Sequence, residues 1–233
     1  ITSKVWNTSH HPKNVVKECK QTLSDLQLDY LDLYLMHWGI AFKPGAELEP
    51  IDEHGYPVTE AVSVQETWQA MESLVKKGLV KAIGVANFTA TQLVDLLTYA
   101  KIKPAMNQVE LHPYLTQTAL IDFCFYKDIA VTAYSPLGTP ANKDPNDPIL
   151  LRDGVIIKIA KAHHKSPAQV LLRWTIQRGT IAIPKSVHRQ RIKENMDIFD
   201  FALRPEDMEE INALNRNHHF VNPIHWWKIP CFS

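Results

Sequence analysis

The sequence predicts an α/β fold built on a parallel sheet, and three observations support this prediction. Short apolar runs rich in β-branched residues alternate with segments of helical period along the 233 residues, an order typical of strands joined by helices. The strand starts lie mostly about 25–30 residues apart, close to the length of one strand–helix unit. No Gly-x-Gly-x-x-Gly motif follows a strand, which disfavours a doubly wound dinucleotide-binding fold.

The architecture that fits this pattern is a (β/α)8 TIM barrel with roughly the first two β/α units absent from the chain. Such barrels usually need about 250 residues or more, and this chain has 233. The first residue is Ile1 rather than Met, and Ile1 to Lys4 has the pattern of the second half of a strand. We therefore expect the chain to begin inside the fold.

Six strands and the helices between them are expected in chain order. The predicted strands are residues 1–6, 31–37, 80–88, 105–111, 130–137 and 180–187. Apolar residues at helical spacing, such as Val15, Cys19 and Leu23, predict the connecting helices. Ser166 before Pro167 has the pattern of a helix N-cap. Residues 1–233 are expected to form one barrel domain, and 218–233, which are aromatic without helical period, a C-terminal loop.

Composition excludes several classes of protein. The net charge is zero, so a nucleic-acid or membrane-surface role has no global electrostatic support. No apolar run approaches 18 residues, which argues against a membrane span. Cys19, Cys124 and Cys231 are odd in number and far apart, which is typical of reduced thiols in a cytoplasmic protein. The histidine pairs do not have the spacing of metal ligands, so no metal is predicted.

Polar side chains recur where the predicted strands end, and in a barrel these ends converge on the face that carries active sites. The last of them is the clearest. Lys185 and Ser186 follow a β-branched run that stops at Pro184, and Arg191 comes next in an expected helix start. Two cations near unpaired helix N–H groups favour a bound phosphate. On residue pattern alone, a solvated helix end is the competing interpretation.

Several segments, in the same order along the chain, resemble the aldo-keto reductase family, most closely its xylose reductase and aldose reductase branch. The matching segments are Asp29 to Trp38, Gly84-Val-Ala-Asn87-Phe88, Asn107-Gln108-Val-Glu110-Leu-His112-Pro113-Tyr114, Thr132 to Gly138, Ile183-Pro-Lys185-Ser186, and the tail with Asn222-Pro223 and Trp226. Together they cover essentially the whole chain. The resemblance implies reduction of aldehydes and aldoses to alcohols by hydride transfer from NADP(H).

The resemblance also implies two catalytic residues. Lys4 matches the family's lysine, which lowers the pKa of a proton-donating tyrosine, and His37 matches the histidine that orients the substrate oxygen. Taken alone, Lys4 has the pattern of a solvated surface residue and His37 that of a core histidine. The family's catalytic tyrosine and aspartate lie upstream of residue 1, so the resemblance implies that these 233 residues alone are inactive.

The cofactor site implied by the resemblance runs along the strand ends. Asn87 and Gln108 match the amides that hold the nicotinamide carboxamide, and Tyr134 matches the ring that stacks on the nicotinamide. The remaining matches are Ser135, Leu137, the 2′-phosphate residues Lys185, Ser186 and Arg191, and the adenine contacts Glu194 and Asn195. Two cations for one phosphate favour NADP(H), with NAD(H) as an additional cofactor in some relatives. Ala86 stands where the family usually has a serine that contacts the carboxamide.

A small-molecule carbonyl compound is the expected substrate, in a pocket lined by Trp6, Trp38, Asn222 and Trp226. Trp68 and Trp174 lie on helical apolar stripes and are expected in the core. The alternatives are a non-enzymatic relative that binds the cofactor as a regulatory or structural subunit, and an inactive fragment. No nucleic-acid or membrane partner is expected, and the chain is expected to be a monomer or a homodimer.

Overall fold

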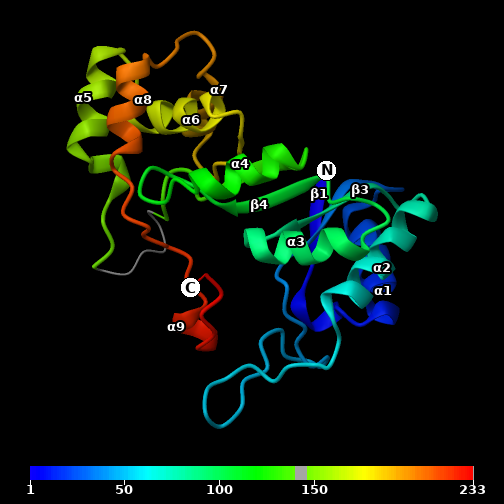
Figure 1. Cartoon of the computed structure of the whole chain (residues 1–233). Coiled ribbons are helices and arrows are strands. Elements are labelled where there is room, and N and C mark those ends of the chain that lie inside the picture. The colour runs from blue at the N-terminus through cyan, green and yellow to red at the C-terminus, as the bar shows by residue number, and fades with distance from the viewer. Residues whose placement is uncertain (140–145, 233) are drawn as a thin grey trace. The chain divides into compact units, whose positions relative to one another are not determined.

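The computed structural model describes residues 1–139 and 146–232 (Figure 1). The chain divides into two compact units. Unit 1 holds Ile1–Gln108, Asp122–Ala130 and the residues from Asn222 onward, and unit 2 holds Val109–Ile121 and Val131–Val221. The single-domain prediction therefore stays untested.

The strands form one six-stranded sheet in the order β1-β2-β3-β4-β5-β6. Its strands are β1 (Thr2–Val5), β2 (Leu31–Met36), β3 (Val80–Ala86), β4 (Met106–Glu110), β5 (Ala130–Tyr134) and β6 (Ile181–Ala182). In unit 1, β1 pairs with β2, β2 with β3 and β3 with β4, and in unit 2 β5 pairs with β6, all of them parallel. The predicted parallel α/β sheet is confirmed. The absence of two preceding units is not confirmed.

Strands β5 and β6 end earlier than the sequence predicted, for local backbone reasons. Ile183 N donates the last ladder hydrogen bond of this segment, to Ala133 O at 3.3 Å, and Pro184 has no N–H to continue it. Ser135 has a φ of 50°, which turns the chain out of β5 directly after Tyr134. The predicted strands 130–137 and 180–187 were therefore too long. Their ends are loops that carry candidate site residues.

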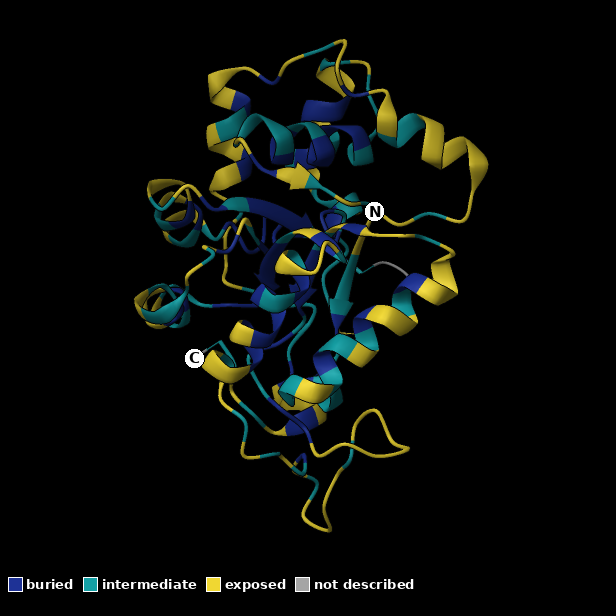
Figure 2. Ribbon diagram, turned by 90° about the vertical axis from the view of Figure 1, so that its right-hand side faces the viewer, coloured by how far each residue is buried: buried dark blue, intermediate teal, exposed yellow. Residues whose placement is uncertain are grey.

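The helices α1 (Pro12–Leu26), α2 (Val64–Lys76) and α3 (Ala90–Tyr99) belong to unit 1. Helix α1 buries Val15, Cys19 and Leu23 and lies beside α2 (Figure 1). Figure 2 shows the buried stripes of the helices and the exposed stripes opposite them. Helix α2 starts with a capping box at Ser63. The Ser63 hydroxyl accepts a hydrogen bond from the Glu66 N–H, and the Ser63 N–H donates to the Glu66 carboxylate. Helix α4 (Thr118–Tyr126) is shared between the two units.

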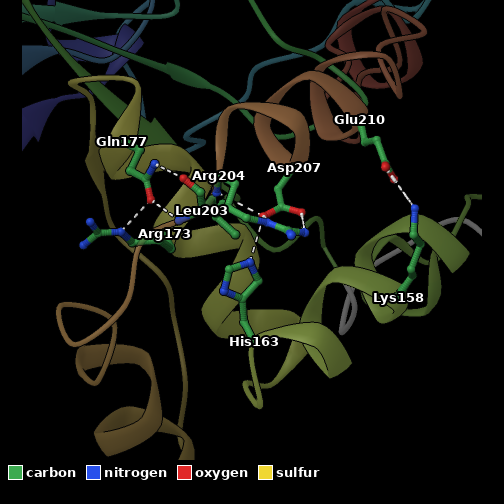
Figure 3. A network of polar contacts seen from close by, with 8 residues as sticks. All are labelled: Lys158, His163, Arg173, Gln177, Leu203, Arg204, Asp207 and Glu210. Carbon is green, nitrogen blue, oxygen red and sulfur yellow. Dashed lines mark hydrogen bonds and ion pairs between the residues drawn. The ribbon is translucent and has the colours of Figure 1, made fainter.

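Unit 2 contains α5 (Gly154–Ala162), α6 (Pro167–Gln177), α7 (Arg189–Met196) and α8 (Pro205–Asn212). A buried carboxylate, Asp207 of α8, joins the start of α8 to the end of α5 (Figure 3). It accepts hydrogen bonds from the Arg204 guanidinium and backbone N–H and from His163 Nε2 at 2.8 Å. The Arg204 guanidinium, followed by His163, holds the pKa of Asp207 well below its usual value. The carboxylate is therefore charged in the folded state and stabilises this end of unit 2.

The predicted core tryptophans are confirmed. Trp68 and Trp174 are fully buried. Their indole N–H groups donate to Ile102 O at 3.1 Å and to Asn212 Oδ1 at 2.9 Å. Each large apolar ring is therefore buried without leaving its polar atom unpaired.

Shorter elements complete the described chain. Two 3-10 helices occur, η1 (Asn7–Ser9) and η2 (Leu150–Arg152), and a one-turn helix, α9 (Ile224–Trp227), lies in the tail. The prediction of a loop throughout 218–233 was thus wrong at α9. No helix in residues 1–139 or 146–232 is long and apolar enough to cross a membrane.

Candidate functional site

The candidate catalytic residues of unit 1 lie at the ends of adjacent strands. Lys4 is in β1 and His37 follows β2, where its N–H donates to Val5 O at 3.2 Å. Burial lowers the pKa of Lys4. Burial, and then the charge of Lys4, lower the pKa of His37 to about 4. His37 is therefore a neutral imidazole near pH 7, able to donate or accept one hydrogen bond without carrying charge.

Aromatic rings surround His37 in unit 1. The Trp6 ring meets the His37 ring edge-on with centroids 4.9 Å apart, and the Trp38 ring stacks at 6.5 Å. Trp227 of α9 packs against Trp6, Trp38 and Phe42 at centroid distances of 6.3, 5.3 and 4.9 Å. This cluster supplies an apolar wall beside a polar imidazole, which is the usual composition of a small-molecule pocket.

The two tail residues predicted for the pocket behave differently from Trp227. Trp226 is half exposed, and the centroids of its ring and the Trp227 ring lie 6.4 Å apart. Asn222 Oδ1 accepts a hydrogen bond at 3.2 Å from the N–H of Ile224, the first residue of α9. The roles of Trp226 and Asn222 as substrate contacts stay predictions. Two other tail residues reach the cluster, Trp227 and Phe232, whose rings contact the Trp38 ring at centroid distances of 5.3 and 5.8 Å. No pattern in the tail distinguishes the two tryptophans, because the segment has no period.

The candidate carboxamide residues are neighbours in unit 1. Ala86 of β3 is in register with Gln108 of β4, and Asn87 N donates to Gln108 O at 2.9 Å. Asn87 has a left-handed φ of 60°, and its Nδ2 donates to His37 O at 3.0 Å. Both amides are almost fully buried. The side chain of Asn87 thus fixes the backbone at the end of β2.

A cavity of about 470 Å³ brings together the predicted phosphate residues of unit 2. One wall is the turn after β5, and the other is the segment between β6 and α7 with Arg191 from the first turn of α7. The lining includes the predicted residues Ser135, Leu137, Lys185, Ser186 and Arg191. Its volume and its two cations fit a phosphate-bearing nucleotide.

The other predicted cofactor residues of unit 2 lie apart from this cavity. Asn195 lines a second, apolar cavity of about 660 Å³, which also touches Lys185 and Ser186. Glu194 accepts from Gln190 Nε2 at 3.1 Å on the surface of α7. Burial, followed by the charge of Glu110, raises the pKa of Tyr134 well above its usual value, so this phenol stays neutral. The adenine and nicotinamide contacts of these residues stay predictions.

Sequence reasoning missed His188, which lines the 470 Å³ cavity beside Lys185 and Arg191. The His188 N–H donates to Ser186 Oγ at 3.1 Å. This hydrogen bond closes a turn that brings His188 to the cavity, directly before α7 begins. The Ser186 hydroxyl, three residues before α7 starts at Arg189, was the available signal.

The sequence model of the Aldo/keto reductase family matches residues 1–216. The chain belongs to the aldo/keto reductase family. It is 51% identical over 225 residues to the Aldo-keto reductase family 1 member A1-A of Danio rerio, covering 96% of this chain and 69% of that protein. Aldo-keto reductase family 1 member A1 of Homo sapiens is 48% identical over 226 residues, covering 96% of this chain and 70% of the relative.

A solved structure titled as an aldose reductase from Giardia lamblia matches the fold with a TM-score of 0.94 and 43% identity. The match covers 100% of this chain and 78% of that one, which supports the predicted barrel architecture. As a member of this family, the chain is an oxidoreductase that acts on small carbonyl compounds with a nicotinamide cofactor. The alternative of a non-enzymatic cofactor binder is not favoured.

In the ranges 1–139 and 146–232, no group of three or more His, Cys, Asp and Glu side chains is placed to hold a metal ion. Ala141, at a position where the resemblance implies an aspartate, falls outside the described residues.

Proposed function

We propose that the chain reduces aldehydes, aldoses among them, and prefers NADP(H) to NAD(H). The cavity of unit 2 carries this proposal, because Lys185 and Arg191 line it together with the Ser186 hydroxyl. A phosphate monoester attracts two cations strongly, whereas a ribose hydroxyl in the same place gains little from them. We assign this cavity to the 2′-phosphate.

Unit 1 supplies the groups for the carbonyl. A bound nicotinamide would supply the hydride, and the oxygen of the substrate then gains negative charge and takes up a proton from the tyrosine that the family resemblance implies. A neutral His37 donates a hydrogen bond to that oxygen, and the half-buried ammonium of Lys4 supplies positive charge next to it. The rings of Trp6, Trp38 and Trp227 exclude water from this polar pair.

The cofactor preference is tested by calorimetric titration with NADPH and NADH. Lys185→Ala and Arg191→Ala should each weaken NADPH binding by about tenfold, because each removes one charge-assisted contact. NADH binding should change little. Arg189→Ala is the matched control, since Arg189 is an exposed cation on α7 outside the cavity lining. Equal losses for NADPH and NADH, or an equal loss in the control, would contradict the proposal.

The catalytic role is tested at His37. Replacing His37 with alanine removes the donor that faces the developing oxygen charge, so turnover should fall by about 100-fold or more. NADPH affinity should stay near that of the unmodified protein. A loss of cofactor binding without a change in turnover at saturation would assign His37 to the cofactor instead.

Two further proposals concern the location of the protein in the cell and the activity of the 233 residues alone. We place the protein in the cytoplasm on the strength of its three free cysteines, two of which are buried. The resemblance also implies that the 233 residues alone are inactive, a prediction that an aldehyde-dependent NADPH oxidation assay decides. All turnover measurements on variants are therefore made in the complete protein, which carries the tyrosine and aspartate that the resemblance implies.

A further inference from the structure

A second buried carboxylate of unit 2, Glu110, lies at the end of β4 and has no part in the proposed chemistry. It is 1% exposed. His112 Nε2 lies 3.0 Å from Oε1, and the backbone N–H groups of Phe220 and Val221 donate to the two oxygens at 2.8 and 3.2 Å. His219 Nδ1 lies 3.4 Å from Oε2. The Glu110 carboxylate thus contacts three consecutive residues, His219–Val221, near the C-terminal end of unit 2.

Glu110 is charged in this setting. Burial alone would raise the pKa of Glu110, but the hydrogen bonds from His112 and His219 and from the backbone of Phe220 outweigh burial and hold the pKa below its usual value. A buried carboxylate that receives several donors is a strong and directional anchor. The segment His219–Val221 is therefore held in place mainly by its backbone.

The residue that this anchor positions is Phe220. Its ring packs against the His112 and His218 rings at centroid distances of 4.9 and 4.7 Å. It also lies directly against Gly138, where an added Cβ would come within 3.2 Å of the ring. Phe220 and the Leu137–Thr139 turn also border a small cavity of about 10 Å³, together with residues 148–151, so little empty space remains beside this contact.

The turn that Phe220 presses on is a wall of the proposed cofactor cavity. Leu137, Gly138 and Thr139 line the 470 Å³ cavity together with Lys185 and Arg191. Gly138 has a φ of +72°, and its N–H donates to Ser135 O at 2.9 Å, so the turn is tight. The ring of Phe220 supports this turn from the side, and a shift of the ring would let the cavity wall move.

We propose that Glu110 is a positioning residue for the cofactor: it anchors His219–Val221 and seats Phe220 against Gly138, which sets the turn that walls the phosphate cavity. This inference rests on the proposed function of that cavity. Glu110 touches neither substrate nor cofactor and acts through Phe220.

A double-mutant cycle tests the coupling, read by calorimetric titration with NADPH. Glu110→Gln keeps the shape but cannot accept from all the donors, so NADPH should bind about tenfold more weakly. Phe220→Ala should have a similar effect. The double variant should be no weaker than either single variant, since both break the same link. The kcat at saturating NADPH should stay close to that of the unmodified protein.

Asp207→Asn is the matched control, because Asp207 is also buried in unit 2 and also receives a histidine and a backbone N–H. It should lower the melting temperature and leave NADPH affinity unchanged. If Glu110→Gln lowers only the melting temperature, or if the two effects add in the double variant, the proposal is overturned. If Glu110→Gln does not fold, Phe220→Ala decides alone: unchanged affinity overturns the proposal and weaker binding supports it.

Lys185→Ala separates this inference from the function on which it rests. When Lys185→Ala weakens NADPH binding but Glu110→Gln and Phe220→Ala do not, only the positioning role fails. When Lys185→Ala has no effect, the cavity is not the phosphate site, and the inference falls with it.

Discussion

The candidate carbonyl site of unit 1 and the candidate phosphate cavity of unit 2 differ in how far water reaches them. In unit 1, Lys4 and His37 are partly buried, and burial lowers the pKa of both. In unit 2, Lys185 and Arg191 line an open cavity and are exposed. The difference shows which electrostatic forces each site can use. In the partly buried site, the His37 dipole and the Lys4 charge act with little screening by water. In the exposed cavity, the attraction of Lys185 and Arg191 for an anion is screened by water and salt.

The largest effect is expected at Lys4. Lys4→Met keeps roughly the length of the side chain and removes the charge that lowers the His37 pKa. Turnover should fall by about 100-fold to 1,000-fold, because a charge in a desolvated site stabilises the developing oxygen charge strongly. Steady-state kinetics at saturating NADPH measures it. Lys81→Met, an exposed lysine of β3 paired with Asp32, is the control and should have little effect.

A second prediction concerns the loss of folding stability at acid pH. Burial, followed by the proximity of His37, lowers the pKa of His10 to about 4, and His10 is 1% exposed. The unfolded chain takes up the proton near pH 6.5 and the folded chain does not, so this contribution to stability is full above about pH 6.5 and is lost as pH falls towards 4.

Replacing His10 with glutamine should therefore flatten the acid side of the stability curve, by about 2–3 kcal/mol between pH 7 and pH 4.5. Urea unfolding at several pH values measures the free energy. His54→Gln is the control, because that side chain is 73% exposed. An unchanged slope for His10→Gln would show that water reaches the buried site.

The exposed cavity should instead respond to salt. Raising NaCl from 50 to 500 mM is expected to weaken NADPH binding by about tenfold, because the Debye length falls to a few ångströms. The affinity for NADH should change much less. In Arg191→Ala the salt dependence should shrink, since one of the two screened cations is gone. A salt-independent Kd for NADPH would mean that the cations are buried when the cofactor is bound.

The smallest effect is expected at Ala86, which is buried and in register with Gln108. The resemblance puts a serine at this position in most relatives. Ala86→Ser adds a hydroxyl beside the two amides and should lower the cofactor Kd by about threefold, roughly the value of one neutral hydrogen bond after desolvation. Weaker binding would show that the hydroxyl pairs with the protein backbone instead.

Much of the fold was accessible from the sequence because it depends on local pattern. The six strands and the buried stripe of Val15, Cys19 and Leu23 follow from period and composition. The pairing of strand ends such as Lys4 and His37 follows from parallel topology. The early end of β6 was missed, although Pro184, which lacks the N–H that a ladder requires, was a local signal for it.

What escaped prediction depends on contacts between residues far apart in the chain. Sequence pattern indicates only a structural role for Glu110, because its partners Phe220 and Val221 lie far along the chain and offer only backbone groups, which leave no trace in side-chain pattern. Trp227 and Trp226 are adjacent and chemically identical, so only the turn of α9 decides which is buried. His188 was missed because its place depends on a turn rather than on a strand end.

The aromatic cluster around His37 has a consequence for spectroscopy. Four of the six tryptophans, Trp6, Trp38, Trp226 and Trp227, form one chain of ring contacts within unit 1. Trp68 and Trp174 lie in separate, fully hydrogen-bonded sites. Excitation energy absorbed by any of these four rings therefore passes to the others. One of them, Trp6, is in contact with the His37 imidazole. The part of the intrinsic fluorescence that comes from these four rings therefore reports on the carbonyl site, and a change in emission is a label-free signal of substrate entry.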